Sequence, residues 1–179
     1  MALDTAKLLH DQAWTLLEAD SGFASAVKPG NRLKQTDKEY QAKADIKRQP
    51  SDFPCCLIRV AGESLNDPVS QTPQTFGMNA ASYTSATADY GVPGTLTLLV
   101  KIIYDKMQLT TTSPVESYVK RALLSAGPRF GLNTWVSGFR LTMKRADKKN
   151  EETGYSLRTV AEYTLTFQIR PKLSQITGA

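Results

Sequence analysis

The stretch SPVESYVKRALLSAGP, residues 113–128, decides the fold because it predicts a helix with two defined ends. Ser113 is suited to cap the first free N–H groups, Pro114 fits the first helical position, and Glu116 completes a capping box. Gly127 can take the left-handed conformation past the end of the helix, and the proline after it prevents continuation. We therefore expect a helix over residues 113–126.

One side of this helix is apolar and nothing along it is suited to chemistry. At helical spacing, the side predicted to be buried consists of Val115, Tyr118, Val119, Ala122, Leu123 and Ala126, while Glu116, Lys120 and Arg121 are expected to face water. A second amphipathic helix is predicted over residues 3–17. Each apolar stripe needs a surface to pack on, and we expect that surface to be a sheet.

Four segments predict that sheet. Strands are expected at residues 53–61, 95–105, 135–144 and 155–170, and the second is apolar enough to be buried on both faces for much of its length. The charged run RADKKNEETG, residues 145–154, predicts a hairpin loop. The fold class is therefore α+β in the order α-β-β-α-β-β, with a mixed or antiparallel four-stranded sheet, two helices packed on it and a long C-terminal β-hairpin.

The 179 residues, of which 41% are hydrophobic and 22% charged, fit a single domain over residues 1–179. Two segments interrupt its regular elements. Residues 62–91 form a long polar loop, and residues 28–50 form a basic insertion that carries most of the net charge of +5. The basic residues of this insertion are Arg32, Lys34, Lys38, Lys43, Lys47 and Arg48, and one interpretation of the segment is a solvated, mobile charged loop.

The sequence favours a protein that is not an enzyme and predicts no catalytic, cofactor or metal site. It lacks phosphate-cradling glycine loops, paired zinc-ligand motifs and calcium-binding loops. Adjacent Cys55 and Cys56 would point to opposite faces of a strand and are interpreted as reduced, small apolar residues. The only histidine, His10, is interpreted as a packed or half-exposed helix residue. No segment is long and apolar enough to cross a membrane, and the start of the chain lacks a signal-peptide pattern.

The last predicted strand is longer than a compact domain of this size. Its sixteen residues would span roughly 50 Å, whereas a compact chain of this length has a diameter of about 40 Å. The strand would bend at a bulge or project, and a projecting hairpin would bury its apolar face against a neighbouring subunit. The residues expected at subunit or partner contacts are Leu8, Leu124, Arg145, Lys148, Lys149, Tyr155 and Arg158.

The order of five segments carries a resemblance to a known family. After an N-terminal helix these segments are FPCCLIRV, TLTLLVKIIYD, SPVESYVKRALLSAG, WVSGFRLTMKR and RTVAEYTLTFQIRP. In the order of its elements, its size and the spacing of its hydrophobic residues, nearly the whole chain resembles the tail terminator proteins of tailed bacteriophages. The basic insertion and the polar loop make it longer than compact members of that family.

The resemblance implies a structural virion protein, assembled in the host bacterial cytoplasm and located at the junction of tail and neck. Such subunits form a ring, commonly a hexamer, that caps the tail tube, ends its polymerisation and offers a docking surface to the head connector. The implied partners are copies of the chain, the tail tube protein, the head–tail connector and DNA that passes through the bore without sequence recognition. We expect residues 62–91 and 146–154 to meet partners and the basic insertion to lie at the ring's edge or bore.

Two other interpretations stay open. Related neck, tail-completion and head–tail joining subunits share similar arrangements of strands and helices. A nucleic-acid-binding domain is favoured by the net charge, but acidic residues interleave the basic insertion and Tyr40 is its only aromatic residue, so no stacking surface is evident.

Overall fold

The computed structural model describes residues 4–33, 53–65, 91–105, 114–132, 135–149 and 156–172. Along them the elements are α1 (Thr5–Ala19), α2 (Ser21–Ala26), a 3-10 turn (Pro29–Asn31), β1 (Arg32–Leu33), β2 (Cys55–Leu65), β3 (Gly94–Asp105), α4 (Pro114–Ser125), β4 (Val136–Lys149) and β5 (Ser156–Ile169). The α+β class is confirmed. The described residues add the short helix α2 and the two-residue strand β1 to the predicted elements.

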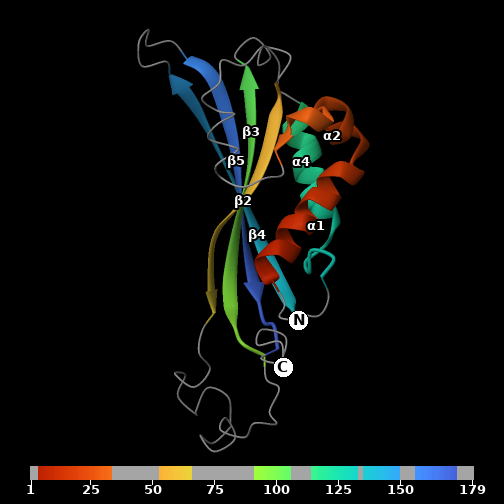
Figure 1. Cartoon of the computed structure of the whole chain (residues 1–179), viewed down its shortest axis with the longest axis vertical. Helices are drawn as coiled ribbons and strands as arrows, with labels where there is room; N and C mark the ends of the chain where they lie inside the picture. Colours follow the sequence, from red (N-terminus) through yellow and green to blue (C-terminus); the bar gives the residue numbers. More distant parts are fainter. Residues whose placement is uncertain are drawn as a thin grey trace, which may run out of the picture.

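The strands form one mixed sheet in the order β1-β2-β3-β5-β4. β1 runs parallel to β2, and all other neighbours pair antiparallel. Figure 1 shows α1, α2 and α4 together on one side of the sheet. We call this side the helix face, to which Leu98 and its partner Leu165 belong, and the other side the open face, to which Thr97 and its partner Thr166 belong.

The helix face carries the main core because strand alternation sends every second side chain toward the helices. On β5 every second side chain from residue 161 is apolar, and all of these are buried: Ala161, Tyr163, Leu165, Phe167 and Ile169. The helices cover them with buried side chains that include Leu9, Ala13, Trp14, Leu17, Phe23, Val119 and Leu123. The two predicted helices therefore pack on the sheet as expected.

The ends of α4 match the sequence prediction. The helix begins at Pro114 and ends at Ser125, and Gly127 follows with a left-handed φ of 69°. The capping role of Ser113 lies outside the described residues. Glu116 was expected to face water, but it is 9% exposed, because its side chain turns toward Arg145 on β4.

A second, smaller core lies on the open face at one end of the sheet. It consists of Leu33, Phe53, Cys55, Leu57, Ile103 and Val160. Cys55 belongs to this cluster and Cys56 to the main core, so the two thiols point to opposite faces as predicted, and both are buried. Burial raises the pKa of the Cys56 thiol well above its ordinary value.

Several strand predictions need correction. β2 continues to Leu65, and β4 continues to Lys149 through half of the predicted hairpin loop. β3 is buried on both faces only near Ile103, because Thr95 on its open face is exposed and Thr97 half-buried. The ends of β2 and β4 resemble loops in the sequence because they lack the apolar alternation on which a strand prediction depends.

The C-terminal hairpin does not project as a bare arm over its described length. β5 lies between β3 and β4, and β3 pairs with it from Ile169 to Arg158. Its apolar side chains from Ala161 to Ile169 are buried in the same chain. The expectation that this apolar face needs a neighbouring subunit is therefore wrong for the described side chains of β5.

Candidate assembly surfaces

The helix layer exposes two leucines that the sequence singled out. Leu8 on α1 is 37% exposed and Leu124 on α4 is 54% exposed. Each lies beside a buried stripe rather than within it, because Leu9 and Leu123, the adjacent leucines, fill the core. Both side chains are thus accessible to a partner, and their role in contacts stays a prediction.

The second half of β2 is exposed on both faces. From Arg59 to Leu65 every residue is exposed, and Val60 and Leu65 each retain 39% of their surface. A β-bulge between Val60 and Gly62 shifts the pairing with β3 by one residue. The sequence prediction missed this surface, because the run AGESL lacks the apolar alternation of a strand.

Near this surface α1 and β2 are joined by a polar contact. The Thr5 hydroxyl at the start of α1 donates a hydrogen bond to the Glu63 carboxylate, and Thr5 is 5% exposed. Glu63 therefore points to the helix face, as its pairing with Leu96 requires. This contact fixes the exposed half of β2 against the helix layer.

At the opposite edge of the sheet, β4 is tied to α4 by an ion pair. The guanidinium of Arg145 donates to the carboxylate of Glu116 in the first turn of α4, and the Tyr163 hydroxyl donates to the Glu116 carbonyl at 3.4 Å. Burial, followed by the nearby negative charge of Glu116, raises the pKa of Tyr163 well above its ordinary value. Met143, two residues before Arg145, leaves 38% of its surface exposed. Arg145, predicted as a contact residue, is therefore engaged inside its own chain.

The other predicted contact residues lie at the far end of the hairpin. Lys148 on β4 pairs through its backbone with Arg158 on β5, and Lys149 pairs with Ser156. The side chains of these residues and the whole of Tyr155 lie outside the described part of the chain. The structure thus brings Lys148 and Arg158 together as strand partners and leaves their contact role a prediction.

Of the predicted basic residues, Arg32 alone is described, and it has a structural role. Its guanidinium donates to the carbonyl oxygens of Val27 and Ala24, each at 2.9 Å, and lies 3.5 Å from the Glu18 carboxylate. A cation at these last carbonyls of α2 complements the negative end of the helix. Lys34, Lys38, Lys43, Lys47 and Arg48 lie outside the described residues.

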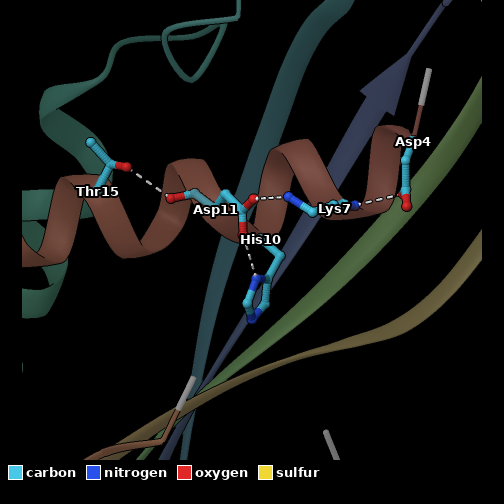
Figure 2. Close-up of polar contacts among 5 residues, drawn as sticks. All are labelled: Asp4, Lys7, His10, Asp11 and Thr15. Atoms are coloured by element: carbon cyan, nitrogen blue, oxygen red, sulfur yellow. Dashed lines mark hydrogen bonds and ion pairs between the residues drawn. The ribbon is translucent and has the colours of Figure 1, made fainter. Parts of the chain in front are cut away.

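The exposed side of α1 carries a run of polar contacts, shown in Figure 2. Lys7 is bonded to Asp11 at 2.7 Å, and the His10 ring lies 3.1 Å from the same carboxyl group. The hydrogen bond from Lys7, with a smaller one from His10, lowers the pKa of Asp11. These are helix-surface pairs at short sequence spacing, so they stabilise α1 weakly and form no enclosed reaction site.

Within the described residues, no group of three or more histidine, cysteine, aspartate or glutamate side chains could hold a metal ion. In the same part of the chain, no helix has the length and apolar content needed to cross a membrane. The candidate assembly surfaces among the described residues are the two exposed leucines of the helix layer and the exposed end of β2.

Comparison with known proteins identifies a fold but no family. Neither the protein families nor the curated proteins include a match to this sequence. Among solved structures, the chain matches a chain from the virion of a native gene transfer agent particle, with a TM-score of 0.53 and 13% sequence identity. The match covers 94% of this chain and 99% of that chain. The two chains therefore share a fold over nearly their entire lengths.

Proposed function

We propose that this protein is a structural component of a phage-type virion and that it acts as the tail terminator. In this role, copies form a ring, commonly of six, that caps the finished tail tube, stops its growth and offers the docking surface for the head connector. The observation that carries the proposal is the fold shared end to end with a chain of a gene transfer agent virion. The sequence resemblance to tail terminators favours this role over other positions in the virion.

The described surfaces support assembly. A closed ring needs two different surfaces on each subunit, one for each neighbour. β2 offers an exposed strand end with Val60 and Leu65, while the helix layer offers Leu8 and Leu124 on other elements. Exposed apolar side chains beside hydrogen-bonding strand edges are typical of surfaces that pair with another chain. We propose that these surfaces meet neighbouring copies or the tail tube protein, and that the subunit is not catalytic.

A second role in the virion is compatible with the same fold. A neck, tail-completion or head–tail joining subunit would also form a ring at the junction and would also let DNA pass through its bore. The two roles, terminator and joining subunit, differ in what happens to the tail when the subunit is missing. A terminator limits the growth of the tube, whereas a joining subunit connects a finished head to a finished tail.

Deletion of the gene from the phage or prophage that encodes it, followed by electron microscopy of the particles, tests the proposal. We expect tail tubes of uncontrolled length that lack attached heads, with normal lengths and joined heads restored when the protein is supplied from a plasmid. Tails of uniform length beside separate, filled heads would assign the protein to the joining step instead. Normal, infectious particles would contradict both proposed roles.

A further inference from the structure

We propose that the open face of the sheet binds the phosphate backbone of duplex DNA. The cations Arg59 on β2 and Arg140 and Lys144 on β4 would hold phosphates at the two margins, and threonine hydroxyls beside these cations would contact the same phosphates. The biological meaning of this inference rests on the proposed virion role, in which DNA passes through the ring. The binding itself is a property of the single chain and can be measured separately.

The cross-strand register places these residues in a regular grid. Three rows cross the open face from β4 through β5 and β3 to β2: Arg140-Thr166-Thr97-Gly62, Thr142-Thr164-Leu99-Arg59 and Lys144-Glu162-Lys101-Leu57. Arg59 stands on β2 and Arg140 and Lys144 stand on β4, whereas the centre carries Lys101 and several hydroxyl groups. The face extends by a further row, in which Gln168 lies opposite Thr95.

The charge of this face is unbalanced. Its one described carboxylate, Glu162, is bonded to Lys101 at 2.8 Å. Arg59, Arg140 and Lys144 are exposed, and within the described part of the chain none of them forms an ion pair. Three cations are therefore available to attract a polyanion. Among the described residues of this face, the only carboxylate is already paired with Lys101.

The spacing of the cations suits a duplex. β4 and β2 are separated by three strand intervals, or about 14 Å at the usual interval, and Arg140 and Lys144 are four residues apart, a similar distance along β4. The major groove of B-form DNA is about 12 Å wide. Cations at both margins would therefore reach phosphates on both sides of one groove. Threonine hydroxyls are frequent phosphate ligands, and those of Thr142 and Thr166 stand beside the β4 cations, where they would contact the same phosphates.

The same face is poorly suited to other partners. Protein interfaces depend on buried aromatic and large apolar anchors, and beyond the small core at one end the described open face offers only the half-buried Leu99. Binding of single-stranded DNA uses aromatic side chains on which bases stack, and the described part of this face beyond that core has none. Contacts to phosphates without base contacts predict binding that does not depend on sequence.

Fluorescence anisotropy with a labelled 20-base-pair DNA, measured over a range of salt concentrations, tests the proposal on the full chain. With three phosphate contacts, the plot of log K against log salt should have a slope of about −3. In the double variant Arg140→Gln, Lys144→Gln the slope should shrink to about −1, with affinity at least about tenfold weaker at low salt. Both residues are exposed, so the variant should keep the far-ultraviolet circular dichroism of the parent.

The matched control is Lys28→Gln, Lys120→Gln, which removes the same charge from exposed positions away from the open face. It should leave the slope and affinity unchanged. Equal losses in the two double variants would overturn the proposal, because binding would then follow net charge. Absence of DNA binding by the parent, tighter binding of the single strand, or equal displacement by polyglutamate at matched charge would also overturn it. None of these results bears on tail length in the deletion strain.

Discussion

At the scale of single residues, Gly22 of α2 packs closely against the ring of Tyr118 on α4. A Cβ atom at this position would lie 2.7 Å from ring carbons of Tyr118 on α4. We predict that Gly22→Ala lowers the free energy of unfolding by about 1–3 kcal/mol, because the ring must move out of a packed layer. Denaturant unfolding, followed by circular dichroism, measures the change.

Gly30 provides the matched control, since a Cβ atom there would meet nothing within 4 Å. Gly30→Ala should leave stability unchanged or raise it by a few tenths of a kcal/mol, through the lower entropy of the unfolded chain. Equal stability of the two variants would contradict the close packing of α2 on α4.

Asp20 joins three helices and predicts a dependence of stability on pH. Its carboxylate caps α2 by accepting from the Phe23 N–H and takes two hydrogen bonds from Arg121, at 2.7 and 2.8 Å. The Arg121 hydrogen bond, assisted by the backbone N–H of Phe23, lowers the pKa of Asp20 below 3.8. The stabilisation is therefore present above pH 3.8 and is lost as the pH falls through the lowered pKa.

We expect Asp20→Asn to destabilise the protein near pH 7, even though asparagine still caps α2, and the deficit to shrink as the pH falls below about 4. Urea unfolding at a series of pH values measures it. In an Arg121→Gln background the same substitution should show a much weaker pH dependence. A deficit that stays constant from pH 7 to pH 2 would refute the ion pair as its source.

At the scale of elements, the Glu116–Arg145 pair holds the β4 edge against α4. The Glu116 side chain is 11% exposed and that of Arg145 is 45% exposed, so removal of the cation leaves a mostly buried carboxylate without its partner. We predict that Arg145→Gln destabilises by about 2 kcal/mol and that a double-mutant cycle with Glu116→Gln gives a coupling of about 1–2 kcal/mol. Additive effects of the two substitutions in thermal or urea unfolding would show that the pair contributes nothing.

The sequence predicted those elements whose ends or faces have a strong local cause. Pro114 and Gly127 bound α4, and the apolar residues from Ala161 to Ile169 reveal the buried face of β5. The extensions of β2 and β4 were not predicted because the runs GESL and RADKK lack the apolar alternation of a strand. β1 is two residues long and owes its existence to its parallel partner β2, which no local pattern encodes.

At the scale of the whole molecule, the candidate surfaces were predictable only in part. Leu8 and Leu124 could be identified because they break a helical stripe. The internal roles of Arg32 and Arg145 could not, because each depends on carbonyl or carboxylate groups that the fold brings together. The basic open face likewise could not be predicted from the sequence, because its cations come from strands that are far apart in the sequence.

Ring assembly gives a prediction at this scale. We expect Leu124→Glu and Leu8→Glu to leave the unfolding curve of the chain nearly unchanged, because both side chains are exposed. If they line the contacts between copies, light scattering of the purified protein should show a species of about six times 19.7 kDa that is lost in these variants. Lys120→Glu, another exposed change on α4, is the control. Identical assembly by all the variants would remove both leucines from the interface.

Immunogold electron microscopy of purified particles tests the central claim most directly. If the protein terminates the tail, an antibody against the chain should label intact particles at the junction of tail and head, and label free tails at the end that joins the head. Particles that carry no label at any point, including after the heads are detached, or that carry label along the whole tube, would contradict the account.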